Sequence, residues 1–150
     1  MILHLDLREF LGFLNSEKSE FLIVGAHALA HYATPRYTGD LDIFARISAA
    51  NADAILRAMS QFGLGDIGVT RAMLLEANTV IQLGRPPNRI DILTGLTGVS
   101  FEDAWPNRVQ GMLDGVPVAY LGREDLIANK RALGRAKDLA DIEAIEKGRK

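Results

Sequence analysis

The amino-acid sequence predicts an α+β domain in which helices flank a small mixed β-sheet. Short apolar runs of strand length alternate with longer segments whose apolar residues recur at helical spacing. Two pairs of strand-like segments are joined by sequences that are typical of turns. The chain closes with two helical segments separated by Gly134, which indicates a C-terminal helical pair.

The first half of the chain alternates helices with strands. The N-terminal segment places its large apolar residues on one helical face. The run FLIV is apolar throughout and precedes a glycine, as a buried strand does. A helix is expected after this strand, and Pro35 ends it. The expected elements are a helix over 7–15, a strand over 20–25, a helix over 26–33, a strand over 40–47, and helices over 49–62 and near 70–76.

The second half contains two hairpin-like pairs and the helical pair. RPPN joins one pair of strands, and Asp114-Gly115 is a strong hairpin turn between the other two. Ser100 can cap a short helix. The expected elements are strands over 79–84 and 88–93, a helix over 101–105, strands over 109–113 and 116–121, and helices over 123–133 and 136–147.

Length and composition narrow the class of protein. At 150 residues the chain suits one domain with a real core, and we expect residues 1–150 to form it. The absence of cysteine excludes disulfides, thiolate zinc sites and a cysteine nucleophile. A net charge of −2 gives no overall field that would attract nucleic acid, although a local basic patch is compatible with it. Because no apolar run reaches transmembrane length and no signal-peptide pattern is present, we expect a cytoplasmic protein without a membrane partner.

The segment PRYTGDLDIFARI contains a strand that begins with two carboxylates. Side chains alternate across a strand, so Asp40 and Asp42 share one face. Two close carboxylates repel each other, and a divalent cation such as Mg²⁺ or Mn²⁺ relieves the repulsion. If the strand that carries Asp91 is a neighbour, all three acids can converge, as two-metal phosphoryl transfer requires. The competing interpretation is a turn or a solvated strand face, because the pattern is short.

Residues close to the acidic strand suit phosphate groups. Gly25 lies at a strand–helix junction, where free backbone N–H groups and the helix dipole can hold a phosphate. Arg36 and Thr38 are good phosphate partners, and Gly39 lets the backbone approach a ligand closely. A single glycine at such a junction is also compatible with a plain turn. Its position shortly before the acids favours the phosphate interpretation.

A carboxylate on the apolar stripe of the last helix needs a partner. Asp138 falls between Ile142 and Ile145, where an unpaired charge is costly. Two interpretations remain open at this stage. Asp138 either favours the helix dipole from the first turn, or forms a salt bridge or active-site contact with Lys130 or Arg135.

Two histidines also have the spacing of paired metal ligands. His27 and His31 are four residues apart on one helical face. The helix lacks the glutamate of a metalloprotease motif, and the chain lacks thiolates. We therefore favour packing against the sheet, or lining of a nucleotide cleft, over zinc binding.

Together these residues resemble the nucleotidyltransferase superfamily, which has the polymerase-β-like fold. That family's pattern is a strand, Gly-Gly or Gly-Ser, a helix, a strand with Asp-x-Asp, and a third acid on a later strand. The corresponding residues here are Gly25-Ala26, Asp40-Leu41-Asp42 and Asp91. Two segments are similar to parts of small bacterial AbiEii-like members of the superfamily, which are related to type IV toxin–antitoxin systems. These segments are VGAHALAHYATPRYTGDLDI and NKRALGRAKDLADIEAI. Ala26 is a departure, since it removes a possible serine hydroxyl contact to the triphosphate.

The resemblance implies an Mg²⁺- or Mn²⁺-dependent enzyme that moves an NMP from an NTP to a hydroxyl acceptor and releases pyrophosphate. Asp40, Asp42 and Asp91 would bind metal, and Asp91 would help to deprotonate the acceptor. The implied nucleotide contacts are Gly25, Ala26, Arg36, Thr38, Gly39, Lys130 and Asp138. The acceptor is expected to be tRNA, a protein or a small molecule. The alternative is a non-catalytic or weakly catalytic interaction module, such as one component of a toxin–antitoxin pair that binds a small helical partner.

Overall fold

The computed structural model describes residues 5–33, 40–65, 67–85 and 89–148. The elements follow the order predicted from the sequence, and their ends differ from the prediction by no more than two residues. In chain order they are α1 (Leu5–Ser16), β1 (Phe21–Val24), α2 (Gly25–Tyr32), β2 (Asp40–Ala45), α3 (Ala49–Gln61), α4 (Arg71–Leu75), β3 (Val80–Leu83), β4 (Arg89–Leu93), α5 (Phe101–Ala104), the 3₁₀ helix η1 (Trp105–Asn107), β5 (Val109–Leu113), β6 (Val116–Tyr120), α6 (Arg123–Leu133) and α7 (Ala136–Lys147).

The strands form one mixed sheet in the order β3-β4-β2-β1-β6-β5. Strands β3 and β4 form one antiparallel pair, and β5 and β6 form the other, as predicted. Between them, β1 pairs antiparallel with β2 and parallel with β6, while β2 pairs parallel with β4. The prediction of an α+β fold with a small mixed sheet is confirmed. The sheet topology places the acidic strand β2 near its centre, with β4 as its neighbour.

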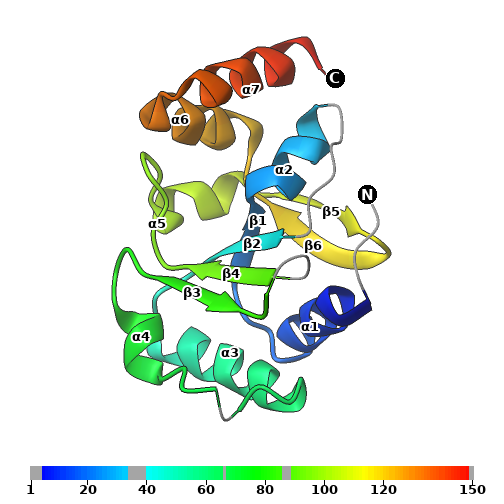
Figure 1. Cartoon of the computed structure of the whole chain (residues 1–150), viewed down its shortest axis with the longest axis vertical. Helices are drawn as coiled ribbons and strands as arrows, with labels where there is room; N and C mark the ends of the chain where they lie inside the picture. Colours follow the sequence, from blue (N-terminus) through cyan, green and yellow to red (C-terminus); the bar gives the residue numbers. More distant parts are fainter. Residues whose placement is uncertain (1–4, 34–39, 66, 86–88, 149–150) are drawn as a thin grey trace.

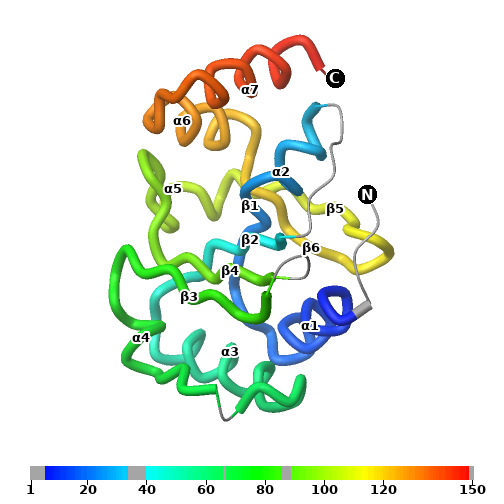
Figure 2. The backbone as a smooth tube through the Cα atoms, viewed as in Figure 1, coloured from blue at the N-terminus to red at the C-terminus, as the bar shows by residue number. Residues whose placement is uncertain are grey.

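Helices cover both sides of this sheet. Figure 1 shows α1, α3 and α4 on one side, and α2, α6 and α7 on the other. Helices α6 and α7 pack against each other, as do α1 and α3, and the tube in Figure 2 shows the two pairs at opposite ends of the molecule. The predicted C-terminal helical pair is therefore present. Helix α2 contacts β1, β2 and both C-terminal helices, so it links the sheet to the pair.

The hydrophobic core explains why apolar and acidic side chains alternate at the start of β2. Helix α1 buries Phe10, Leu11 and Leu14, while β2 buries Leu41 and Ile43 completely. Burial of a side chain of this size stabilises the fold by roughly 1.5–3 kcal/mol. The two aspartates of β2 remain partly exposed on the opposite face. The predicted division of β2 into an apolar face and an acidic face is confirmed.

Local capping agrees with the sequence. The Ser100 hydroxyl accepts a hydrogen bond from the Asp103 backbone N–H at the start of α5, as predicted. Asp114 and Gly115 both have positive φ values, 48° and 81°, which is the backbone of a tight hairpin turn. Gly134 ends α6 in the left-handed conformation, which lets α7 fold back on α6.

Within the described residues, none of the helices combines the length and the apolar character needed to cross a membrane.

Candidate functional site

Four charged side chains form a square on neighbouring strands. The register of the parallel pair sets Asp40 beside Arg89 and Asp42 beside Asp91. Residues two apart on a strand share a face, so all four side chains project from the same side of the sheet. The predicted approach of Asp91 to the acid pair is confirmed. Its cause is the β2–β4 pairing, which brings together residues about fifty positions apart.

Arg89 holds two of the three acids. Its Nε lies 2.9 Å from Asp91 Oδ1 and its Nη2 lies 3.1 Å from Asp91 Oδ2, so the pair is bidentate. The same Nη2 donates to Asp40 Oδ2 at 3.1 Å. The sequence analysis missed Arg89. The signal was available, because Arg89 and Asp91 are two residues apart in one strand and therefore share a face.

Asp42 is the acid with the least favourable electrostatic environment. Burial, followed by the charges of Asp91 and Asp40, raises the pKa of the Asp42 carboxyl from 3.8 to about 6. A side-chain hydrogen bond with Asp91 acts in the same direction, while the charge of Arg89 opposes it. The positive charge of Arg89 therefore compensates the environment of the Asp42 carboxylate only in part.

Gly25 makes room for that carboxylate. It has φ +67° at the start of α2, a conformation that L side chains rarely adopt. A Cβ at this position would lie only 2.2 Å from Asp42 Oδ2. The preceding residue, Val24, provides no side-chain cap for α2. The backbone N–H groups of the first turn of α2 therefore begin directly beside Asp42.

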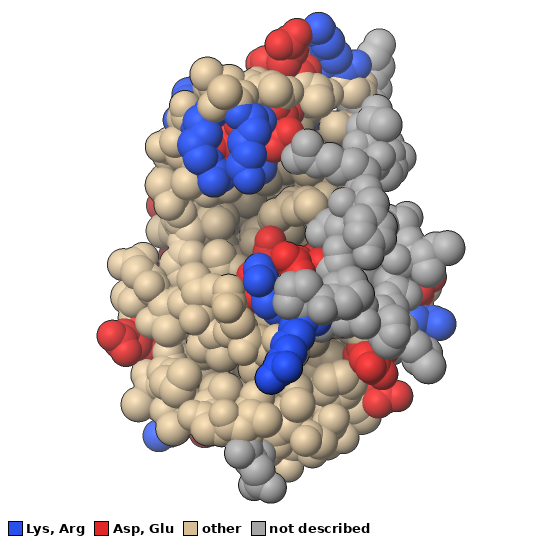
Figure 3. Space-filling view, viewed as in Figure 1, with Lys and Arg blue, Asp and Glu red and all other residues tan. Residues whose placement is uncertain are grey.

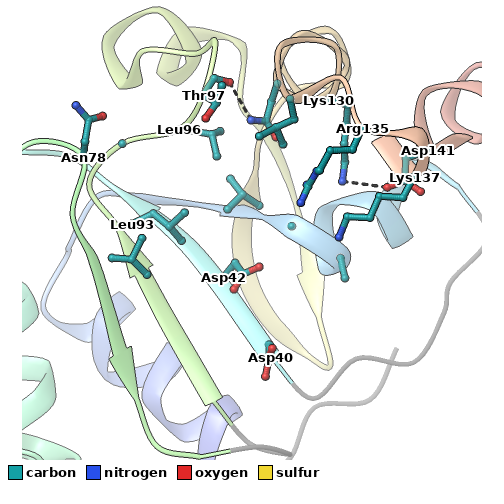
Figure 4. Close-up of a pocket in the computed structure, with 17 residues that line it drawn as sticks. Asp40, Asp42, Asn78, Leu93, Leu96, Thr97, Lys130, Arg135, Lys137 and Asp141 are labelled. Atoms are coloured by element: carbon teal, nitrogen blue, oxygen red, sulfur yellow. Dashed lines mark hydrogen bonds and ion pairs between the residues drawn. The ribbon is translucent and has the colours of Figure 1, made fainter. Parts of the chain in front are cut away.

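A cavity of about 600 Å³ opens above these groups. Its lining includes Gly25, Ala26 and the two acids of β2, together with residues of α6 and α7 (Figure 4). The full lining is Val24, Gly25, Ala26, Asp40, Asp42, Asn78, Val80, Leu93, Gly95, Leu96, Thr97, Asn129, Lys130, Leu133, Arg135, Lys137 and Asp141. Figure 3 shows the same region as a hollow, with acidic atoms at its centre and Lys and Arg atoms on its upper side.

The basic side of the cavity comes from the turn between α6 and α7. Arg135 and Lys137 extend from there toward β2 in Figure 4. Lys130 is nearly buried, and its Nζ lies 3.0 Å from Asp141 Oδ2. The acid pair and these cations face each other across one space, which is the charge arrangement that a metal-bound polyphosphate requires.

Asp138 lies beneath this basic group. It is fully buried, and its Oδ2 accepts hydrogen bonds from Nε of Arg135 at 2.6 Å and from the Arg135 backbone N–H at 3.2 Å. Lys130 Nζ is 3.8 Å from its Oδ1. The hydrogen bond from Arg135 is the main cause that lowers the pKa of Asp138. Asp138 therefore caps the first turn of α7 and also forms an ion pair, as the two interpretations predicted. Asp138 is not among the residues that line the cavity.

Other predicted site residues have separate outcomes. Arg36, Thr38 and Gly39 lie outside the described residues. His31 stacks on Tyr120, with ring centroids 4.1 Å apart. His27 is buried, and burial is the main cause that lowers its pKa. Their positions agree with the preferred interpretation of packing against the sheet.

In the described part of the chain, no three His, Cys, Asp or Glu side chains are grouped as a ready-made metal site. Near the acids, Arg89 forms ion pairs with Asp91 and with Asp40. Asp40 and Asp42 both line the cavity as hard oxygen donors, and Asp40 also accepts a hydrogen bond from Arg89. Compared with models of protein families and with curated proteins, the chain matches no family model and no curated protein.

Proposed function

We propose that this chain is a divalent-cation-dependent nucleotidyltransferase that moves an NMP from an NTP to a hydroxyl acceptor and releases pyrophosphate. One observation carries the proposal. A single cavity joins the acids of β2, the N-terminus of α2 and the cations of the α6–α7 turn. Anionic phosphates fit the last two features, and a cation bridges them to the first.

The acid pair suits Mg²⁺ or Mn²⁺. Such ions are commonly held by one or two carboxylates together with substrate phosphates. Asp40 and Asp42 both line the cavity, and the pKa of Asp42 is raised first by burial and then by the charges of Asp91 and Asp40, which a cation would compensate.

When bound, the ion would withdraw charge from the phosphates and hold them near the acids. Metal binding and deprotonation of the acceptor by Asp91 remain predictions. In the structure the Asp91 carboxylate is engaged by Arg89.

The other residues bind and orient the triphosphate. The backbone N–H groups at Gly25 and Ala26 lie at the positive end of α2 and suit phosphate oxygens. Lys137 and Arg135 supply charge from the opposite wall. Lys130 is fixed by Asp141, so its position is set before a ligand arrives. In this proposal Arg36, Thr38 and Gly39 complete the phosphate contacts.

The order of elements supports the nucleotidyltransferase fold. The chain has, in this order, a strand, a glycine turn, a helix, a strand with Asp-x-Asp and a later strand with a third acid. The last two strands are neighbours in the sheet. The acceptor class is tRNA, a protein hydroxyl or a small molecule, and the protein is cytoplasmic in this proposal.

Release of pyrophosphate tests the reaction class. The protein is incubated with each NTP, Mg²⁺ or Mn²⁺, and total tRNA or a cell lysate, and pyrophosphate is measured. We expect release that needs the metal and is lost in Asp42→Asn. Asp53→Asn is the matched control, because Asp53 is a partly exposed acid on α3 that pairs with Arg71 and lies outside the cavity. Equal release by both variants would remove the acids from the mechanism.

A second candidate function is an interaction module, such as one member of a toxin–antitoxin pair with a small helical partner. The observation in its favour is the edge strand β5, where Val109 and Met112 are exposed. Co-purification of a partner that is lost in Met112→Glu, combined with no binding of any NTP, would favour this function over the enzyme.

A further inference from the structure

Arg89 occupies the centre of the acid cluster as a bridging cation. Its guanidinium forms three hydrogen bonds, two to Asp91 and one to Asp40, at 2.9–3.1 Å. Asp91 and Arg89 have side-chain exposures of 12% and 27%, so solvent screens the pair only in part. In the described part of the chain, Arg89 donates no hydrogen bond to Asp42. The guanidinium thus pairs fully with Asp91 and through one hydrogen bond with Asp40, and its hydrogen bonds do not reach Asp42.

One divalent ion is enough to balance the charges of the square formed by Asp40, Asp42, Arg89 and Asp91. Three carboxylates and one guanidinium have a net charge of −2 when ionised, which a single Mg²⁺ or Mn²⁺ balances. In two-metal sites the ions lie about 3.5–4 Å apart and share ligands. A second ion at Asp91 would have to displace a bidentate guanidinium or approach its positive charge closely.

We propose that Arg89 is a fixed cation in place of a second metal ion, so that the site takes one divalent ion, on Asp40 and Asp42. This inference rests on the metal site of the proposed function. Arg89 is then a positioning residue that holds Asp91 through two hydrogen bonds and Asp40 through one, and it occupies the place beside Asp91 that a second ion would need. The geometry of the square carries the inference, because register and hydrogen bonds fix all four residues.

Manganese binding tests the inference without any turnover. The full chain is titrated with Mn²⁺ in the presence of a saturating α,β-methylene NTP, and bound Mn²⁺ is counted by electron paramagnetic resonance. Two ions at the distance of a two-metal site give a spin-coupled spectrum, whereas one ion gives an uncoupled spectrum. We expect one uncoupled ion per chain in the wild type and in Arg89→Lys, which keeps the positive charge.

Arg89→Met removes that charge at similar length. We expect it to bind a second Mn²⁺ and to show the coupled spectrum. Arg57→Met is the matched control, because Arg57 is an exposed arginine of α3 that pairs with Glu17, and it should retain one ion. Circular dichroism in EDTA and in Mn²⁺ establishes which variants are folded. If Arg89→Met does not fold, the wild-type count and the Arg89→Lys count decide.

Two coupled ions in the wild type would overturn the inference and leave the metal site of the proposed function in place. One uncoupled ion in a folded Arg89→Met protein would also overturn it, because Arg89 would then exclude nothing. If the wild type binds no Mn²⁺, both the inference and the proposed metal site fail. Loss of Mn²⁺ in Asp42→Asn locates the counted ion at the acid pair.

Discussion

Replacing Asp42 with asparagine should stabilise the metal-free protein at neutral and alkaline pH. Burial and the neighbouring acids raise the pKa of Asp42 in the folded protein to about 6, from an ordinary value of 3.8. The group's contribution to stability is therefore fully present below pH 3.8 and is lost as pH rises through about 6. A shift of this size corresponds to an upper limit of about 3 kcal/mol at pH 8, at 1.36 kcal/mol for each pKa unit.

Asparagine has nearly the same shape and does not ionise, so it avoids this cost. For a chain of this length, 1 kcal/mol corresponds to a Tm shift of roughly 2–4 °C, which predicts an increase of at most about 6–12 °C.

Thermal unfolding in EDTA, followed by circular dichroism between pH 4 and pH 8, measures this effect. The gap in Tm between Asp42→Asn and the wild type should be smallest at pH 4 and widest at pH 8. Asp53→Asn, which removes a partly exposed acid of α3, should show no such widening. Parallel Tm profiles for Asp42→Asn and the wild type would refute the reasoning, because Asp42 would then have an ordinary pKa in the folded protein.

Three further predictions concern the walls of the site. Gly25→Ala should lower the free energy of unfolding by about 1–3 kcal/mol and weaken Mn²⁺ binding, because its Cβ would lie 2.2 Å from Asp42 Oδ2; urea unfolding and Mn²⁺ titration check this, and an unchanged protein would contradict it. Lys137→Met should weaken binding of magnesium tripolyphosphate about tenfold by calorimetry, unlike Lys147→Met on the exposed end of α7. Asp138→Asn should lower Tm at pH 7 by more than at pH 3, since its carboxyl has a lowered pKa and its stabilising effect is lost as pH falls through that value; an equal loss at both pH values would argue against the ion pair.

Local chemistry was sufficient to predict most elements. The helix start at Ser100 and the turn at Gly115 depend on residues that are adjacent in the chain, so capping and turn rules identify them. Alternation in β2 likewise separated the acids from Leu41. Whether Asp91 approaches these acids depends on strand pairing over about fifty residues. The sequence analysis could state that outcome only as a condition.

The site residues show the same division. The burial of Asp138 followed from helical periodicity, but the choice of Arg135 as its main partner depends on how α7 begins at the turn after Gly134. His31 shares a helical face with His27, yet its aromatic partner is Tyr120 in a distant strand. Alternation alone places Arg89 on the same strand face as Asp91, whereas its contact with Asp40 depends on the β2–β4 pairing.

The most direct test of the central claim follows the phosphates of the NTP separately. Parallel reactions receive α-³²P- or γ-³²P-labelled NTP, with Mg²⁺ or Mn²⁺, and with total tRNA, the protein itself or a cell lysate as acceptor. The proposed function predicts that the α-label enters an acceptor while the γ-label leaves as pyrophosphate, and that Asp42→Asn abolishes both. Transfer of the γ-label, or no transfer of either label by the folded wild type to any of these acceptors, would contradict it.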